Sequence, residues 1–276
     1  MKTIGVDIGG TKTAIGIIDD KSGKVFKKIV IPSKAHKDDN KNLNRIILNI
    51  LDLSNKNKIN KIGIGVPELI NNKGIIKGGY NFKWDNRNLT KYFPDTKYVK
   101  VDSDVRCHLR AEKYFGIAKN YTNFAYINIG TGLSYAHYKD EKIYSGAKGY
   151  AIHFASSKIT LIDWKKNKKI SIIPEEYYSG KEIIKILSIK NNIKKKKILN
   201  DVGESLSSLI GLLINTIDPD KLVLGGGVII NNIDFKKILI KNIYKYILAD
   251  EVKKITIKTS KLKNNTGLLG AGLLFR

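Results

Sequence analysis

The sequence predicts an α/β protein in which two related domains flank a cleft. Two segments support this prediction, because residues 2–19 and residues 124–138 each read as a strand, a glycine-rich turn and a second strand. Helical and strand-like segments follow in both cases, which is typical of a duplicated α/β domain. The chain has 276 residues and is 42% hydrophobic, enough to bury the core of one large or two medium domains.

The first block opens with strands separated by turns, and apolar residues at helical spacing then predict a helix. A short buried strand should end at Pro67, and the segment 74–92 reads as loop with a short strand. The elements predicted for this block are strands 2–8, 13–19, 24–31, 62–66 and 98–101 and helices 40–55 and 105–115.

The second block repeats this order of strand, glycine turn and strand, with helices after it. Its glycine turn is Gly130-Thr131-Gly132, and a later strand runs into Gly225-Gly226-Gly227. The elements predicted for this block are strands 124–129, 133–138, 142–144, 222–224 and 253–258 and helices 175–188, 198–217, 233–247 and from 267.

The charge balance is strongly basic, with 50 lysines and arginines against 25 acidic residues and a formal net charge of +25. Such an excess is common in nucleic-acid-binding proteins. Nearly all of it is lysine, which rises together with isoleucine and asparagine in A/T-rich genomes. Arginine is the better residue for bidentate phosphate and base contacts, and it is rare here. We therefore expect no nucleic-acid partner.

Cys107 is the single cysteine, so no intramolecular disulfide can form and a reducing compartment is compatible. The chain opens directly into a strand-like segment, and it contains no apolar run of about 18 residues. We expect a cytoplasmic protein with no membrane partner.

The segment Asp7–Thr13 is the first candidate for chemistry, as a tight turn between two apolar strands. Gly9 and Gly10 let the backbone approach a bulky anion, and Thr11 and Lys12 add a hydroxyl and a cation. Asp7 ends the first strand and is placed to meet a metal ion, because a carboxylate would repel the anion itself. The spacing differs from a Walker A loop, which needs a longer glycine spacing and a following helix.

Motifs along the whole chain then resemble, in order, those of the ROK sugar kinases, relatives of glucokinase and N-acetylmannosamine kinase. This family belongs to the actin, hexokinase and Hsp70 superfamily. The matching segments are Asp7–Thr13, Gly63–Pro67, Asn81 with Trp84, Val101–Asp104 with Ala111-Glu112, Ile129–Gly132, Gly146–Gly149, Glu175–Gly180, and Asp218-Pro219 with Leu222–Gly227.

The resemblance implies two ribonuclease H-like domains of the actin-like ATPase type. Residues 1–105 would form a small domain on the sugar and phosphate side, completed by a C-terminal helix at about 266–276. Residues 106–265 would form a large domain on the nucleotide side. The family also implies a homodimer.

The activity that the resemblance implies is transfer of the γ-phosphoryl group of ATP to a hydroxyl of a hexose or N-acetylhexosamine. Asp104 would be the general base, and Asp7 would hold Mg²⁺ through water. ATP and its phosphates would meet Asp7, Gly9, Gly10, Thr11, Lys12, Gly130, Thr131, Gly132, Gly225, Gly226 and Gly227. The sugar would meet Gly65, Pro67, Asn81, Ser103, Asp104, His153 and Glu175.

Several of these residues also have a purely structural interpretation. The glycines fit ordinary hairpin turns, and Asp104 fits the N-cap of the helix that follows it. Glu175 fits the first turn of a helix, where a carboxylate is favoured. His153 fits a hydrogen-bonded residue that stabilises a loop.

The sequence departs from the family pattern mostly at the sugar end. Ser103 stands where the family has asparagine, and Ser134-Tyr135-Ala136 replaces glycines. His153 and Ser156 replace the sugar-contacting glutamate and histidine, and no cysteine lies between Ser156 and Glu175, so we expect no structural zinc site. The family's sugars therefore cannot be assigned to this chain.

Two other functions remain open at this point. The altered glutamate and histidine favour a non-catalytic sensor of sugar or nucleotide. The charge suggests a DNA-binding regulator of the same family, but such regulators carry a helix-turn-helix before the first phosphate motif, and only Met1–Val6 precede it here.

Overall fold

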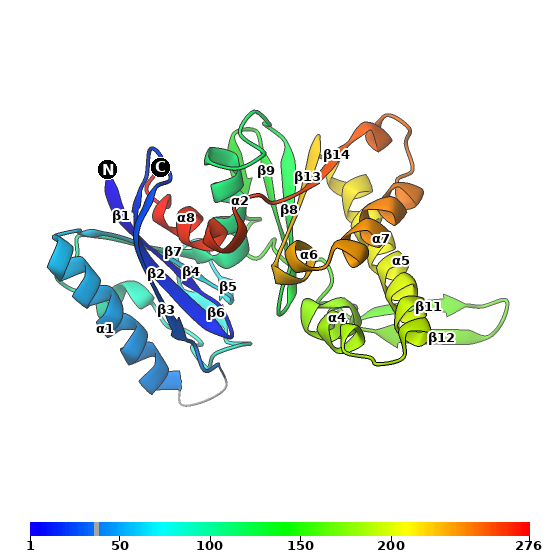
Figure 1. Ribbon diagram of the computed structural model, residues 1–276, viewed down its shortest axis with the longest axis horizontal. Helices are drawn as coiled ribbons and strands as arrows, with labels where there is room; N and C mark the ends of the chain where they lie inside the picture. The colour runs from blue at the N-terminus through cyan, green and yellow to red at the C-terminus, as the bar shows by residue number, and fades with distance from the viewer. Residues whose placement is uncertain (36–38) are drawn as a thin grey trace. The chain divides into compact units, whose positions relative to one another are not determined.

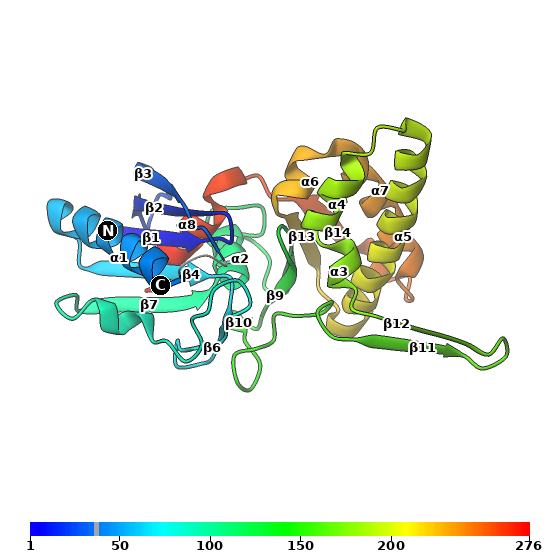
Figure 2. The same ribbon diagram turned by 90° about the horizontal axis from the view of Figure 1, so that it is seen from below.

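Residues 1–35 and 39–276 are described by the computed structural model of the chain, and they fold into two compact units. The first unit comprises Met1–Asn120, Ala136–Ala151 and Lys261–Arg276, and the second comprises Tyr121–Tyr135 and Ile152–Ser260. Figures 1 and 2 show the helices and strands of both units from two directions. Each unit has its own hydrophobic core.

The sheet of the first unit has the strand order β3-β2-β1-β4-β7. β1, β2 and β3 are antiparallel neighbours, whereas β4 runs parallel to β1 and β7 runs parallel to β4. The strands are β1 (Lys2–Ile8), β2 (Lys12–Asp19), β3 (Val25–Pro32), β4 (Lys61–Val66) and β7 (Tyr98–Ser103). A small hairpin of β5 (Leu69–Ile70) and β6 (Ile76–Gly78) follows β4.

Helices α1 (Asp39–Asn57), α2 (Asp104–Tyr114) and α8 (Thr266–Gly272) accompany this sheet. Alternate residues of β1 point to opposite faces, so Ile4 and Val6 join the core that includes α1, whereas Gly5 and Asp7 face α8. A Cβ on Gly5 would lie 2.2 Å from the carbonyl oxygen of Leu268. The missing side chain therefore lets the C-terminal helix lie directly on the strand.

The second sheet repeats this strand order as β10-β9-β8-β13-β14. β13 runs parallel to both β8 and β14, and β9 passes from the second unit into the first after Tyr135. The strands are β8 (Phe124–Ile129), β9 (Leu133–Lys139), β10 (Lys142–Tyr144), β13 (Lys221–Gly225) and β14 (Thr256–Thr259). The repeated order confirms the prediction of a duplicated α/β architecture.

The second core is formed by β8 and β13 with the long helix α5 and its neighbours. The helices of this unit are α3 (Glu175–Tyr178), α4 (Gly180–Leu187), α5 (Asn192–Ile217), α6 (Gly227–Asn231) and α7 (Ile233–Ile243). α5 begins at Asn192 instead of residue 198, because the Asn191 side chain caps it by accepting the Lys194 N–H at 2.9 Å. The exposed lysines of its first turns carry no apolar periodicity that could have predicted this start.

The structure also differs from the prediction in one hairpin of the second unit and in the residues that belong to the first unit. A hairpin of β11 (Ile159–Asp163) and β12 (Lys168–Ile172) lies where no element was predicted. The first unit also extends past residue 105, because α2 packs against α8 of the same unit. The assignment of functions to residues 1–105, 106–265 and 266–276 stays a prediction.

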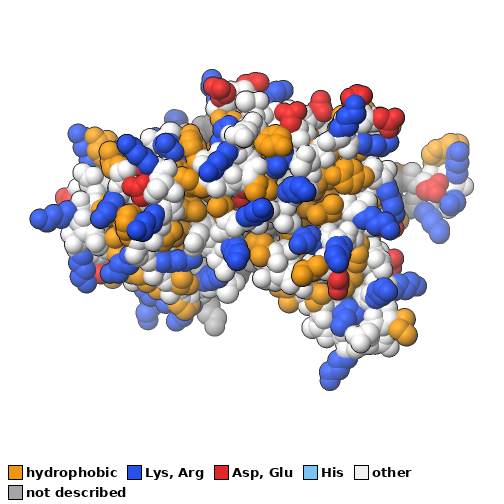
Figure 3. Space-filling view, turned by 45° about the horizontal axis from the view of Figure 1, so that its top comes forward, with side chains coloured by type: hydrophobic (Ala, Val, Ile, Leu, Met, Phe, Trp, Pro, Cys, Tyr) orange, Lys and Arg blue, Asp and Glu red, His pale blue; other side chains and the backbone are white. Residues whose placement is uncertain are grey.

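Positive charge is dispersed over the face of the molecule that is visible in the space-filling view. Figure 3 shows Lys and Arg side chains scattered over the visible face, with smaller groups of Asp and Glu among them. Among the described residues, no helix combines the length and the apolar character needed to cross a bilayer.

Candidate active site

The turn between β1 and β2 has the geometry that the sequence predicts for it. The Gly9 N–H donates to the Lys12 carbonyl oxygen at 3.0 Å, and the Thr11 carbonyl oxygen accepts the Ser33 N–H at 2.9 Å. These bonds fix the turn from both sides, while the side chains of Thr11 and Lys12 are exposed. The turn can therefore offer backbone amides, a hydroxyl and an ammonium group to an anion.

Asp7 lies at the end of β1 in register with Gly65 of β4, which in turn pairs with Asp102 of β7. A Cβ on Gly267 would lie 2.3 Å from the Asp7 carboxyl group, so the missing side chain in α8 makes room for it. Within residues 1–35 and 39–276, no residue donates a hydrogen bond to this carboxylate. Asp7 thus has the free oxygen atoms that a hydrated magnesium ion takes.

Asp104 is the first residue of α2 and follows β7 directly. Its carboxylate accepts the Val105 N–H at 2.6 Å and the Ser103 hydroxyl at 3.4 Å. Ser103, not Asp104, occupies the N-cap, so the structural interpretation of Asp104 as N-cap is wrong in that detail. Asp104 instead carries a carboxylate at the positive end of the helix.

Burial raises the pKa of Asp104 to about 6; His108 acts in the opposite direction, and Asp7 raises the pKa further. A carboxyl group with a pKa this close to neutrality is ionised at pH 7 yet still basic enough to take a proton. This is the electrostatic state that a general base requires.

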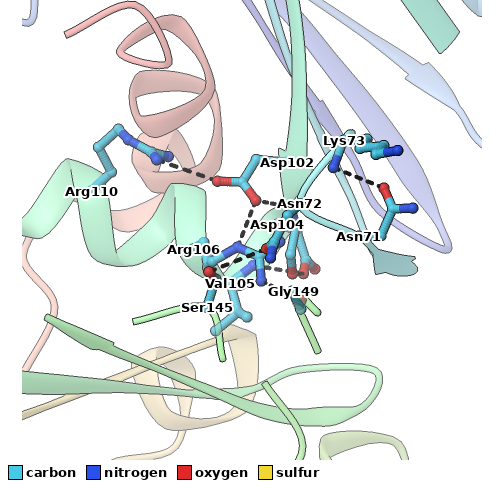
Figure 4. Close-up of polar contacts among 11 residues, drawn as sticks. Asn71, Asn72, Lys73, Asp102, Asp104, Val105, Arg106, Arg110, Ser145 and Gly149 are labelled. Atoms are coloured by element: carbon cyan, nitrogen blue, oxygen red, sulfur yellow. Dashed lines mark hydrogen bonds and ion pairs between the residues drawn. The ribbon is translucent and has the colours of Figure 1, made fainter. Parts of the chain in front are cut away.

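Asp102 and Arg106 form a buried ion pair beside Asp104 that the sequence did not single out (Figure 4). Arg106 Nε lies 2.6 Å from Asp102 Oδ1, and Arg110 Nη2 lies 3.3 Å from Asp102 Oδ2. Arg106 Nη1 also donates to the Gly149 carbonyl oxygen at 2.7 Å. The helix that begins with Asp104 is thereby tied to β7 and to the Gly146–Gly149 segment.

The Gly146–Gly149 segment is held from a second side by the turn after β5. Asn72 Nδ2 donates to the Ala147 carbonyl oxygen at 3.0 Å, and Ser145 Oγ donates to Asn72 Oδ1 at 3.4 Å. The turn is itself stabilised by Asn71 Oδ1, which accepts the Lys73 N–H at 3.0 Å (Figure 4). Both anchors belong to the first unit.

Asn81 lies beside the turn Gly9–Lys12, the candidate phosphate turn of the first unit. Its Nδ2 donates to the Pro67 carbonyl oxygen at 2.8 Å, and a Cβ on Gly10 would lie 3.5 Å from its Oδ1. A Cβ on Gly65 would likewise lie 3.6 Å from the Asp104 Cα. The residues that the sequence assigns to phosphate, sugar and catalysis in this unit therefore gather at the carboxyl ends of β1, β4 and β7.

Glu68 is a further residue of this group that the sequence analysis missed. Its carboxylate accepts the N–H groups of Tyr80, Asn81 and Phe82 at 2.6, 2.8 and 2.8 Å. The available signal was an acidic residue directly after a buried strand and Pro67, where ionised groups are rare unless they are partnered.

The second unit forms its own group around the turn Gly130–Gly132. The Gly130 N–H donates to the Gly132 carbonyl oxygen at 3.1 Å, and Glu175 Oε1 accepts the Leu133 N–H at 2.7 Å. A Cβ on Gly132 would lie 2.6 Å from Glu175 Oε1, so this glycine leaves space for the carboxylate. Glu175 thus lies against the turn, while the Thr131 side chain is exposed.

Ser156 and His153 continue this group. Ser156 Oγ donates to Glu175 Oε2 at 2.6 Å, and His153 Nδ1 lies 3.0 Å from Ser156 Oγ. Partial desolvation of the ring lowers the pKa of the His153 imidazole, while Glu175 acts in the opposite direction. The side chains that replace the family's glutamate and histidine are therefore linked to one another and to Glu175.

The glycines after β13 form a close approach between backbone segments of the second unit. Gly226 has φ +94°, which L side chains rarely adopt, and a Cβ there would lie 2.3 Å from the Ile129 carbonyl oxygen. Gly225 ends β13, and Gly227 begins α6. The ends of β13 and β8 therefore lie close together, and their glycines leave the backbone there unshielded by side chains.

Between Ser156 and Glu175 the chain forms the β11–β12 hairpin. No cluster of three or more His, Cys, Asp or Glu residues suited to a metal ion occurs in the described part of the chain.

Known proteins resemble this chain in sequence and in fold. The ROK family model matches residues 3–161 and 153–276. A glucokinase of Thermotoga maritima is 30% identical over 137 residues, which are 48% of this chain and 43% of the relative. A β-glucoside kinase of Listeria innocua is 24% identical over 98% of this chain and 96% of the relative.

The family also contains regulators, since a xylose repressor of Caldicellulosiruptor bescii is 24% identical over 97% of this chain and 76% of the relative. Among solved structures, a ROK family glucokinase from Streptomyces griseus, in complex with glucose and AMPPNP, has a TM-score of 0.82 at 18% identity, with 99% and 98% of the two chains covered. This likeness confirms that the chain has the two-domain α/β fold of that glucokinase. The chain is a member of the ROK family.

Proposed function

We propose that this chain is an ATP-dependent sugar kinase that transfers the γ-phosphoryl group to a hydroxyl of a hexose or N-acetylhexosamine, with Asp104 as general base. The environment of Asp104 is the observation that supports this proposal most directly. The carboxylate begins α2, its pKa is raised to about 6, and Asp7, Asn81 and the phosphate turn belong to the same group of residues.

In this proposal Asp104 accepts the proton of the sugar hydroxyl as its oxygen attacks phosphorus. Ser103 and the Val105 N–H orient the carboxylate through the bonds at 3.4 and 2.6 Å. Asn81 and Ser103 are the candidate sugar contacts of the first unit, and Glu175 and His153 are the candidates of the second unit, each unit considered by itself.

In the first unit, the backbone of Gly9–Lys12 and the Thr11 hydroxyl are the candidate phosphate contacts. In the second unit, the backbone of Gly130–Gly132 and the Thr131 hydroxyl are candidates of the same kind. Asp7 would hold Mg²⁺ through water, as its free oxygen atoms allow, and magnesium with ATP supplies charge neutralisation on the transferred group. The glycines 225–227 would let the adenosine lie against backbone.

A second candidate function is a non-catalytic sensor of sugar or nucleotide, and the hydrogen bond from Ser156 to Glu175 favours it. That bond orients Glu175 through Ser156, which together with His153 stands where the family pattern has a histidine and a glutamate. A site built to read hydroxyl groups loses much affinity when its polar partners change.

One screen separates the two candidates. The purified chain is incubated with ATP, Mg²⁺ and a panel of hexoses and N-acetylhexosamines, and sugar-stimulated ADP release is measured. Release with at least one sugar supports the kinase. ATP binding by calorimetry without release on any sugar contradicts the kinase and supports the sensor.

A further inference from the structure

Glu68 is a buried acidic residue, 2% exposed, that lies between Pro67 and β5. Its two carboxylate oxygens accept the backbone N–H groups of three consecutive residues, Tyr80 at 2.6 Å and Asn81 and Phe82 at 2.8 Å each. Consecutive amides that converge in this way form a nest, a concavity that binds an anion. Here the anion is supplied by the chain itself.

The nest fixes the backbone on both sides of Asn81, and the side chain of Asn81 is fixed as well. Asn81 Nδ2 donates to the Pro67 carbonyl oxygen at 2.8 Å, so the amide nitrogen is turned away from the phosphate turn. Its Oδ1 is then the atom that lies toward Gly10. Glu68 and Pro67, adjacent in the chain, thus determine together which atom Asn81 presents.

The rest of this loop has anchors of a different kind. The rings of Phe82 and Trp84 stack at 4.2 Å with an angle of 12° and are buried in the first core. The Gly79 N–H donates to Asp85 Oδ1 at 2.9 Å. Packing therefore holds the loop beyond residue 81, and it does not select the orientation of Asn81 itself.

We propose that Glu68 is a positioning residue, which holds Asn81 in the orientation that contacts the acceptor sugar. This role rests on the proposed sugar kinase function. The carboxylate acts only through Asn81 and touches neither sugar nor phosphate. An uncharged side chain at residue 68 would leave at least one amide of the nest without an acceptor and release the loop near Asn81.

The charge of Glu68 gives this role a signature that a packing residue would not have. Burial raises the pKa of Glu68 to about 7, although the hydrogen bonds from the three amides lower it. The negative charge of Asp104 in α2 acts in the same direction as burial. Asp85 is the other acidic group on the loop. Protonation removes acceptor capacity from the nest, so the hold on Asn81 weakens as the pH falls below about 7.

The first test observes the nest without any substrate. In amide NMR spectra of the wild-type chain, the Tyr80, Asn81 and Phe82 N–H signals should titrate together with a midpoint near pH 7. They should stay constant in Glu68→Gln, while Asp85→Asn, the control in the same loop, should titrate like wild type. Signals that do not respond to pH in the wild type, or that still titrate in Glu68→Gln, would overturn the proposal.

The second test measures kinetics with whichever sugar of the panel is phosphorylated. Glu68→Gln should raise the KM for sugar about tenfold and leave the KM for ATP and kcat within about threefold, as loss of a charged hydrogen bond predicts. In the wild type, the KM for sugar should rise as the pH falls from about 8 to about 6, which tests the role even if the variant fails to fold.

The outcomes separate the two claims. Turnover with an unchanged KM for sugar in folded Glu68→Gln, or a pH-independent KM for sugar in the wild type, contradicts the role of Glu68 alone. Absence of turnover with every sugar contradicts the proposed kinase.

Discussion

The hydroxyl of Ser156 and the carboxylate of Glu175 lie 2.6 Å apart, and the hydroxyl donates to Oε2. The other carboxylate oxygen accepts the Leu133 N–H at 2.7 Å. Glu175 is therefore held in one orientation by two donors, one of which replaces a histidine of the family pattern. In the proposed kinase, Glu175 is one of the residues that would contact the sugar, so this pair would influence sugar binding.

Replacing Ser156 with alanine removes one of these donors and lets the Glu175 carboxylate rotate. We expect the KM for sugar to rise about tenfold with little change in kcat, because a hydrogen bond to a charged group contributes about 1.5–3 kcal/mol. Ser171→Ala, which removes an exposed hydroxyl that pairs with Thr160 at 2.6 Å, is the control and should behave like wild type. Equal KM values in Ser156→Ala and wild type would show that the pair is irrelevant to sugar binding.

Arg106→Ala leaves Asp102 with Arg110 as its remaining cation and frees the Gly149 carbonyl oxygen. Because the Arg106 side chain is 5% exposed, the free energy of unfolding should fall by about 3 kcal/mol. Lys185→Ala breaks an exposed ion pair of 2.7 Å with Glu182 and should cost less than about 1 kcal/mol. Urea unfolding of both variants tests this, and similar losses in the two would contradict it.

The raised pKa of Glu68 predicts how the free energy of unfolding depends on pH. Its pKa is about 7 in the folded chain against an ordinary value of 4.5, so the folded state binds more protons between these values. The contribution of Glu68 to the free energy of unfolding therefore falls as the pH rises from about 4.5 to about 7. The difference in the free energy of unfolding between wild type and Glu68→Gln should change by about 3 kcal/mol between these two pH values. Parallel pH curves from urea unfolding would exclude the raised pKa.

Removal of divalent metal should separate activity from stability. The segment between Ser156 and Glu175 contains no cysteine, and it folds as the β11–β12 hairpin. We therefore expect a chelator to abolish ADP release, since Mg²⁺ is needed with ATP, while the Tm stays within about 1 °C of its untreated value. A fall of several degrees on chelation would instead indicate a structural metal.

Hydrophobic pattern and glycine turns were enough to predict most of the fold. The strands over residues 2–8, 62–66 and 124–129 have the same bounds in the structure or differ by one residue, because buried β-strands leave a continuous apolar run. The β11–β12 hairpin escaped prediction because nearly all of its residues are exposed, so its strands lack the buried apolar pattern that marks the core strands. A homodimer stays a prediction.

The candidate site could be predicted in part, because its motifs are local. Gly9–Lys12, Asp104 and Glu175 are recognisable from short segments. Glu68 was not, because its role depends on a loop more than ten residues away, from Tyr80 to Phe82. Contacts of this kind are set by the path of the chain. The sequence around Glu68 indicates only an acidic group that needs a partner, and it does not indicate which amides supply the hydrogen bonds.

Asp104→Asn tests the central claim most directly. Asparagine keeps the shape of the side chain but cannot take a proton, so sugar-stimulated ADP release should fall by about 10²–10⁴-fold. ATP affinity by calorimetry should be retained, and stability at about pH 7.5 should not fall, since the raised pKa means that the ionised carboxylate costs folding energy there. Sugar-stimulated ADP release in the variant at the wild-type rate would contradict the account.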